Sequence, residues 1–202
     1  MEINAELVKK LREKSGVGMM DCKKALVECQ GDFNKASEYL REKGLDKAAK
    51  KAARPANQGI IDSYIHLGSK IGVMLEINCE TDFVARNEIF KNLSHNIALH
   101  IAAAAPLYVS RDEIPDEVIE KEKDIYRKQA INEGKPANVV DKIAEGKLSK
   151  YFQETCLLDQ LYVKDNDLTV GDLITENIAK IGENILIKRF ARWVLGETSS
   201  EE

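Results

Sequence analysis

Every second residue from Ile71 to Cys79 is apolar, and most of the residues between them are not; this period of two is typical of a strand with one buried face. After residue 87 the apolar positions instead recur every three or four residues, which is the period of an amphipathic helix. These helical positions are Ile89, Phe90, Leu93, Ile97 and Ile101. The stretch C-E-T-D-F-V-A-R-N, residues 79–87, is therefore expected at a strand-to-helix junction.

The junction carries a carboxylate and a large aromatic side chain next to each other, Asp82 and Phe83, between Thr81 and Val84. Two interpretations are open. Side chains at such a junction are held rigidly and can point outward, so the pair can contact a partner protein. Alternatively, Asp82 caps the turn and Phe83 folds back onto the core. The pattern alone favours this second interpretation, because buried aromatic residues outnumber exposed ones that anchor partners.

Two further stretches have the pattern of strands. Residues 60–67 precede a plausible turn at Gly68-Ser69, which predicts a hairpin with residues 70–80. Residues 183–195 alternate again and are expected to pair with the hairpin as a third antiparallel strand. Apolar residues occupy both registers of these strands, at Ile60, Ile61, Ile185 and Leu186. A sheet that is apolar on both faces favours self-association, and we predict a homodimer.

Residues 4–44 follow the helical period in three short runs, which predicts a small three-helix module. The expected caps and stops are Asn4, Ser15 to Gly18, Gly31, Asp32 and Gly44. Three helices in about forty residues make a very small core, so such a module is expected to present a surface to a partner.

The candidate surface of this module combines methionines with basic residues, namely Lys9, Arg12, Met19, Met20 and Lys23. Adaptable methionine side chains rimmed by positive charge suit a partner helix that carries acidic residues. The alternative is that one methionine fills the core and the lysines are merely solvated.

Residues 45–57 are rich in alanine and lysine and are expected to form a basic helical linker. A short basic run is more often a solvated face than a nucleic-acid contact. The formal net charge is −4, so the chain lacks the basic excess of an electrostatic nucleic-acid binder, and no direct nucleic-acid contact is expected. No apolar run approaches the length of a membrane span and the start lacks signal-peptide features, which predicts a cytoplasmic protein without a membrane partner.

Two charged helical runs, residues 117–133 and 137–152, are separated by Gly134-Lys135-Pro136. They predict a projecting antiparallel helical hairpin at about residues 116–155. An extended segment, a turn at residues 164–167 and a last helix from Thr169 to Gly182 follow. The expected fold class is α+β, with a three-stranded antiparallel sheet and helices. The expected division is a docking module at 1–44, the linker at 45–57 and a core and dimerisation domain at 58–202.

Motifs for covalent chemistry are absent from the sequence, which has no phosphate-binding loop, dinucleotide fingerprint or nucleophile elbow. His95 and His100 are five residues apart rather than four, and the four cysteines form no C-x-x-C pair, so neither a metal nor a cofactor is expected. Glu80 and Asp82 are candidates for acid–base work, but nothing supplies a nucleophile or an oxyanion pocket beside them. We therefore expect an interaction protein and not an enzyme.

Three stretches resemble one family, elongation factor Ts, the guanine-nucleotide exchange factor of elongation factor Tu. They are L-V-K-K-L-R-E-K-S-G-V-G-M-M-D-C-K-K-A-L at 7–26, N-C-E-T-D-F-V-A-R-N at 78–87 and K-I-G-E-N-I at 180–185. The resemblance runs from about residue 3 to residue 196. Only one copy of the sheet pattern is present, so the chain looks like the short, single-core form of the family.

The resemblance implies a role for each candidate surface. The N-terminal module is ubiquitin-associated-like and docks onto the G domain of the partner through Lys9, Arg12, Met19, Met20 and Lys23. Near the partner's nucleotide site, the intruding residues are Thr81, Asp82, Phe83 and Val84. They dislodge the Mg²⁺ that bridges the GDP phosphates, so that GDP leaves and GTP can bind. This reverses the interpretation of Phe83 that the pattern alone favours. In the short form, a homodimer supplies the second half of the core.

Two rival functions remain open at the level of sequence. A ubiquitin-like or nucleic-acid-binding adaptor would use the N-terminal module and the basic linker, and its RNA binding would be salt-sensitive and survive loss of residues 59–202. A hydrolase that uses Glu80 or Asp82 would turn over substrate without any partner protein.

Overall fold

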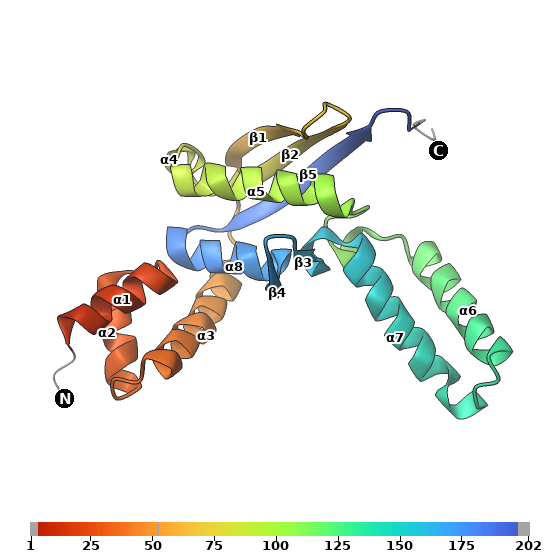
Figure 1. Ribbon diagram of the computed structural model, residues 1–202, viewed down its shortest axis with the longest axis horizontal. Coiled ribbons are helices and arrows are strands. Elements are labelled where there is room, and N and C mark those ends of the chain that lie inside the picture. Colours follow the sequence, from red (N-terminus) through yellow and green to blue (C-terminus); the bar gives the residue numbers. More distant parts are fainter. Residues whose placement is uncertain (1–3, 52, 198–202) are drawn as a thin grey trace. The chain divides into compact units, whose positions relative to one another are not determined.

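The computed structural model describes residues 4–51 and 53–197 (Figure 1). The α helices are α1 (Ala5–Ser15), α2 (Met19–Glu28), α3 (Phe33–Lys51), α4 (Asp82–Ala85), α5 (Glu88–Ala104), α6 (Asp116–Asn132), α7 (Ala137–Thr155) and α8 (Val170–Ile181). The strands are β1 (Gln58–Ile65), β2 (Ile71–Cys79), β3 (Leu161–Tyr162), β4 (Asp165–Thr169) and β5 (Ile185–Val194), and two short 3-10 turns lie at Arg111–Glu113 and Leu157–Asp159. The predicted α+β class is confirmed.

The main sheet is antiparallel and has the strand order β1-β2-β5, so the predicted hairpin and its C-terminal partner strand are confirmed. The alternation in β2 is also confirmed, because Val73, Leu75, Ile77 and Cys79 are all buried. A second, two-stranded sheet was not predicted. Its strands β3 and β4 pair antiparallel with Tyr162 opposite Asp165. The turn between them lies at residues 163–164 and not at the predicted 164–167, because residues 165–167 belong to β4. The polar run of β4 is tolerated because it is exposed.

The N-terminal helices have the predicted caps. The side chain of Asn4 accepts a hydrogen bond from the Glu6 N–H at 2.9 Å, and that of Asp32 accepts from the Asn34 N–H at 3.0 Å. Gly16 ends α1 with a φ of 66°, a left-handed conformation that glycine adopts without strain. The buried core of these helices is formed by Val8, Leu11, Cys22, Ala25, Leu26, Ala36 and Leu40.

The predicted helix stop at Gly44 is wrong, because α3 continues through it to Lys51. Gly44 is buried, and a Cβ atom added to it would lie 3.2 Å from the Cβ of Ala179 in α8. The glycine therefore permits a close approach of two helices instead of ending one. The first residues of the predicted basic linker belong to α3.

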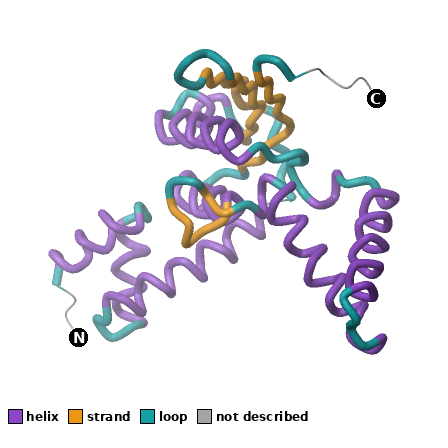
Figure 2. Tube along the Cα trace, turned by 45° about the vertical axis from the view of Figure 1, so that its right-hand side comes forward, coloured by secondary structure: helices purple, strands orange, loops and turns teal. Residues whose placement is uncertain are grey.

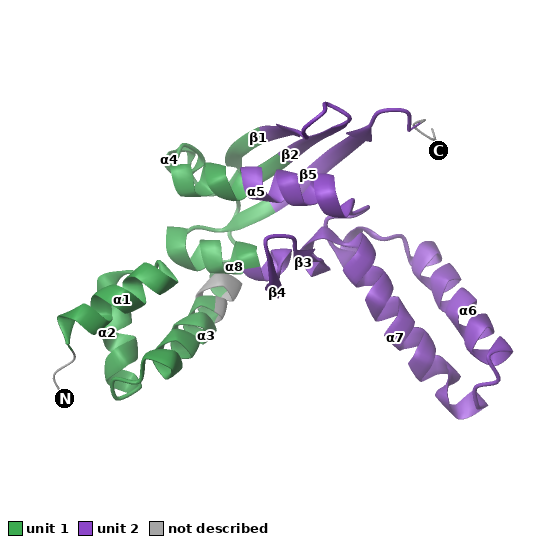
Figure 3. Ribbon diagram, in the orientation of Figure 1, with its two compact units in different colours: residues 1–61, 76–94, 173–186 green, residues 62–75, 95–172, 187–202 purple. Residues whose placement is uncertain are grey.

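The chain divides into two compact units (Figure 3). Unit 1 comprises residues 1–61, 76–94 and 173–186, and unit 2 comprises residues 62–75, 95–172 and 187–202. Unit 1 thus holds the N-terminal helices, the strand-to-helix junction and most of α8. The predicted division into a docking module, a linker and a core, with boundaries at residues 44 and 57, stays a prediction.

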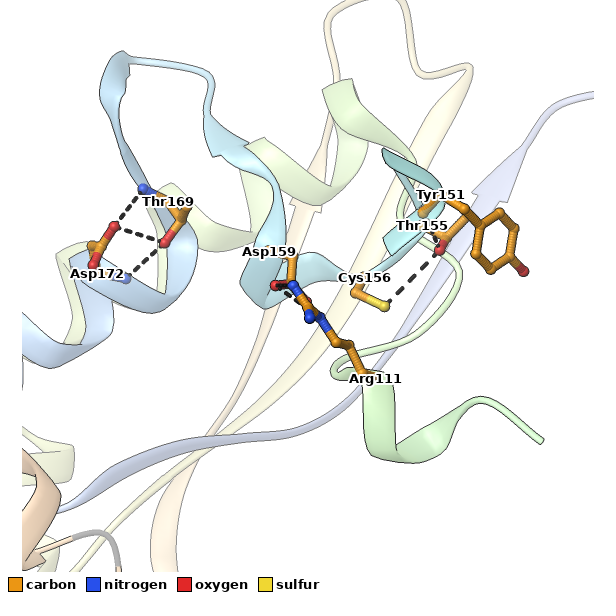
Figure 4. A network of polar contacts seen from close by, with 7 residues as sticks. All are labelled: Arg111, Tyr151, Thr155, Cys156, Asp159, Thr169 and Asp172. Atoms are coloured by element: carbon orange, nitrogen blue, oxygen red, sulfur yellow. Dashed lines mark hydrogen bonds and ion pairs between the residues drawn. The ribbon is translucent and has the colours of Figure 1, made fainter. Parts of the chain in front are cut away.

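The helical hairpin of unit 2 is formed by α6 and α7, two antiparallel helices joined by one turn (Figure 2). Its helices are linked by charge, with Arg127 donating to Asp141 at 2.8 Å and Lys147 lying 3.6 Å from Glu133. Ala130 is fully buried, in keeping with the thin apolar stripes of the two helices. At the base of the hairpin, Arg111 donates to both carboxylate oxygens of Asp159 (Figure 4).

Candidate partner-binding site

The strand-to-helix junction is a single helical turn that presents an aromatic side chain. After the buried end of β2, α4 comprises only Asp82–Ala85, and α5 begins at Glu88. Ala85 is buried beneath the turn, whereas Phe83 is 81% exposed. The alternative in which Phe83 folds back onto the core is therefore wrong.

The cap of this turn is Thr81 and not Asp82. Thr81 has an extended conformation, and its Oγ1 accepts a hydrogen bond from the Val84 N–H at 3.4 Å. The carboxylate of Asp82 instead accepts from Arg86 one turn later, at 2.9 Å. Asp82 is the first residue inside the helix, whereas the side chain that caps a helix belongs to the residue before it, here Thr81. The predicted cap by Asp82 is wrong for this reason.

A carboxylate distant in sequence holds Thr81 in place. Glu183 accepts the Thr81 N–H at 3.0 Å with Oε2 and the Thr81 hydroxyl at 2.7 Å with Oε1. Beside it, the Glu80 carboxylate accepts the Asn184 N–H at 2.7 Å and lies 3.6 Å from the guanidinium of Arg54. Sequence reasoning assigned no role to Glu183 and Asn184. The signal that could have found them is K-I-G-E-N-I, the stretch to which they belong.

The thiol at the end of β2 is part of the same junction. Cys79 donates through Sγ to the Thr81 carbonyl at 3.1 Å. Burial, reinforced by the negative charge of Glu183, raises the pKa of the Cys79 thiol to about 11. The residue is therefore a protonated hydrogen-bond donor at neutral pH rather than a nucleophile.

The candidate docking surface on the N-terminal helices is exposed. Met19 and Met20 open α2 and are 47% and 65% exposed, so the alternative in which one of them fills the core is wrong. The basic residues assigned to the same surface, Lys9, Arg12 and Lys23, are exposed as well. Lys9 lies 3.9 Å from Glu13, an exposed pair that restrains it weakly.

The buried histidine, His100, has a structural role, because both of its ring nitrogens are hydrogen-bonded. His100 is fully buried, its Nε2 lies 2.9 Å from Gln160 Oε1, and its Nδ1 accepts the Val163 N–H at 3.3 Å. Within residues 4–51 and 53–197, no group of three histidine, cysteine or acidic side chains is arranged to hold a metal ion. In the same described ranges, no helix combines the length and apolar character that crossing a bilayer requires.

The chain matches a known protein family. A sequence model described as elongation factor TS matches residues 20–197. Elongation factor Ts of Carboxydothermus hydrogenoformans is 60% identical over 195 residues, which cover 96% of this chain and 90% of that protein. Elongation factor Ts of Thermodesulfovibrio yellowstonii is 59% identical over 201 residues and covers 100% of both chains.

Proposed function

The chain belongs to the elongation factor Ts family, and we propose that it is the guanine-nucleotide exchange factor of elongation factor Tu in the cytoplasm. It binds the GDP-bound partner, promotes release of GDP and so allows GTP to bind. No covalent bond is broken, and the protein is in this sense not an enzyme. It needs no cofactor of its own.

The observation that carries the proposal is the exposure of Phe83 on a capped turn. A side chain that is 81% exposed has nearly all of its apolar surface available to a partner. Burying a phenylalanine contributes about 2–3 kcal/mol. That free energy can oppose the nucleotide-bound conformation of the partner if Phe83 enters a pocket that exists only in the nucleotide-free state.

We propose that the turn, which also carries the carboxylate of Asp82, acts on the metal ion of the partner as well. In the proposal the turn formed by Thr81, Asp82, Phe83 and Val84 enters near the nucleotide site of the partner and displaces the Mg²⁺ that is bound there with GDP. Without that cation the diphosphate is poorly neutralised, and GDP dissociates faster. The coupling is reciprocal, because a factor that weakens nucleotide binding must itself be weakened by the incoming nucleotide.

The N-terminal helices provide a separate docking contact in this proposal. The module is ubiquitin-associated-like, and its contact residues are Lys9, Arg12, Met19, Met20 and Lys23. Exposed methionines adapt to the shape of a partner helix, and the basic residues select one with negative charge. This contact supplies affinity, whereas the turn at Phe83 changes the partner.

Release of a fluorescent GDP analogue from elongation factor Tu tests the proposal. The wild-type protein is expected to accelerate release, and Phe83→Ala is expected to lower that acceleration by at least about 10-fold, from the burial free energy of a phenylalanine. Leu107→Ala is the matched control, since Leu107 is 66% exposed and lies outside both candidate surfaces. A wild-type protein that leaves the release rate unchanged contradicts the exchange function. An equal loss in both variants contradicts the role of Phe83.

We also propose that the protein is a homodimer, which the exposed apolar residues of unit 2 support. Ile65, Met74 and Trp193 in the strands are 64%, 47% and 55% exposed. A Cβ added to Gly72 would lie 3.2 Å from the Ile65 side chain, so these two positions share a face of the sheet. Sedimentation velocity should give a dimer for the wild type and for Leu107→Asp, and a monomer for Trp193→Asp. A wild-type monomer at micromolar concentration contradicts the proposal.

A further inference from the structure

The turn that carries Phe83 lacks part of the usual N-terminal helix signal. In a capping box the residue three positions after the capping Ser or Thr is acidic or an amide, and it accepts the free N–H of the cap. After Thr81 that third position is Val84, which has no acceptor. A helix of four residues is also too short to be stable through its own hydrogen bonds. The exposed turn therefore depends on contacts from elsewhere.

The missing acceptor comes from residue 183. Thr81 donates its N–H to one oxygen of Glu183 and its hydroxyl to the other, across a separation of 102 residues. The hydroxyl proton points to Glu183, so the oxygen keeps its lone pairs for the Val84 N–H. Glu183 thus supplies the half of the capping box that Val84 lacks, and it orients the Thr81 hydroxyl that forms the other half.

We infer that Glu183 is a positioning residue for nucleotide exchange, which holds the Thr81 turn so that Phe83 is presented outward before the partner arrives. The inference rests on the proposed function of that turn. Glu183 acts through Thr81 and does not itself need to touch the partner. Glu183 differs in this from the exposed residues of the turn. It determines how many molecules hold the turn in the conformation that presents Phe83, whereas the exposed residues make the contact with the partner.

The same contacts extend to the N-terminal helices within unit 1. Asn184 donates its side-chain amide to the Arg54 carbonyl at 2.8 Å, and its backbone N–H goes to Glu80. Lys51, at the end of α3, donates to the Gly182 carbonyl at 2.5 Å. Residues 182–184 therefore bind both the turn with Phe83 and the last turn of α3. The segment orients the turn relative to the helix that leads out of the docking module.

Replacement of Glu183 by glutamine disrupts the pair of hydrogen bonds from Thr81 while preserving the size of the side chain. A carboxamide has one acceptor oxygen, and its NH₂ group faces a donor of Thr81, so one of the two hydrogen bonds is lost. If the competent turn is then populated in about a tenth of the molecules, the maximal exchange rate falls about 10-fold. The concentration of factor at half-maximal rate stays within about 2-fold, because docking through the N-terminal helices is untouched.

The first measurement is a double-mutant cycle of exchange rates with Glu183→Gln and Phe83→Ala. If Glu183 acts through the Phe83 turn, its substitution lowers the maximal rate about 10-fold in the wild type and less than about 2-fold in the Phe83→Ala background. The matched control is Asp172→Asn, because Asp172 accepts the N–H and the hydroxyl of Thr169, the residue that caps the other end of α8. Equal losses in both backgrounds, or an equal loss in Asp172→Asn, overturn the inference.

The second measurement needs no partner and separates this inference from the proposed function. Amide hydrogen exchange of Val84 in the free protein should be about 10-fold faster in Glu183→Gln than in the wild type and unchanged in Asp172→Asn. An unchanged Val84 amide overturns the positioning role even if exchange activity is present. A wild-type protein without exchange activity contradicts the proposed function, and with it the role of Glu183 in exchange.

Discussion

Thr81 and Thr169 are the same device built in two ways. Each residue ends an extended segment, caps a helix and donates its N–H and its hydroxyl to a carboxylate. At Thr169 both donors go to Asp172, at 3.0 and 2.9 Å, and Asp172 lies three residues away (Figure 4). At Thr81 they go to Glu183, at 3.0 and 2.7 Å, and Glu183 lies 102 residues away.

The difference follows from what each helix has to do. The cap at Thr169 begins a helix of 12 residues with the buried Val170 and Ile174, which is held mainly by packing. The cap at Thr81 begins a helix of four residues whose largest side chain points into solvent. A long amphipathic helix is stabilised by its buried face, whereas a single exposed turn is not. Only the second therefore depends on a carboxylate from another part of the chain.

The largest effect on stability is expected from Gly59→Ala, which disturbs the strand that leads to the cap at Thr81. A Cβ on Gly59 would lie 2.2 Å from the Ile77 carbonyl oxygen and 2.7 Å from the Asn78 Cα, in the strand that leads to Thr81. The backbone must move, since neither atom belongs to a flexible side chain. We expect a loss of about 2–4 kcal/mol in the free energy of unfolding, measured by urea denaturation.

Gly146→Ala is the control for that substitution. Gly146 lies inside α7, and a Cβ there would have no neighbour within 4 Å. Alanine should raise the free energy of unfolding by up to about 1 kcal/mol, through helix propensity. Equal destabilisation by the two substitutions would contradict the packing argument at Gly59.

A smaller effect, on stability rather than activity, is expected from Thr169→Val. Loss of a helix cap costs about 1 kcal/mol, and this cap lies far from both candidate surfaces in sequence. The free energy of unfolding should fall by that amount while the GDP release rate is unchanged. Thr81→Val should show the opposite balance, with most of its effect on GDP release. The comparison fails if both substitutions affect release equally.

The smallest effect on stability is expected from a lower pH, and it concerns only the cap at Thr169, because a buried histidine lies near that cap. All three histidines lie in unit 2. The buried His100 bonds to the side-chain oxygen of Gln160, and the backbone carbonyl of Gln160 accepts the N–H of Val170, the residue after Thr169, at 3.0 Å. Burial lowers the pKa of His100 from its usual value of 6.5, and the hydrogen bond to Gln160 opposes this only in part. Its Nδ1 is already an acceptor for Val163, so a second proton would break that bond.

The direction of the pH dependence follows from that lowered pKa. Below about pH 6.5 the unfolded chain binds a proton that the folded chain does not, so stability is full above that pH and declines as the pH falls toward the folded-state pKa. Urea denaturation at pH 7.5 and 5.5 should show this decline in the wild type and in His95→Gln, and less of it in His100→Gln. An unaltered decline in His100→Gln assigns it to other groups.

The fold could be predicted wherever a signal is local. The alternation in β2, the stop at Gly182 and the cap at Thr169 each depend on neighbouring residues, and all three are confirmed. The errors arose where a local signal was overridden. Gly44 is a residue type that often ends helices. Here its lack of a side chain instead leaves room for Ala179, which is 135 positions further along the chain.

Local patterns in the sequence were enough to predict most of the helices, the three strands of the main sheet, the family and the residues at the exposed turn, but not the strands β3 and β4. The short motifs around Thr81 and Met19 carried that information, because period and capping act over a few residues. Contacts between distant residues were needed for the rest: Phe83 is exposed, Thr81 is the cap and Glu183 completes that cap. The physical reason is that a four-residue turn has too few internal hydrogen bonds to fix its own conformation, so its geometry is set by a carboxylate that the chain brings back from residue 183.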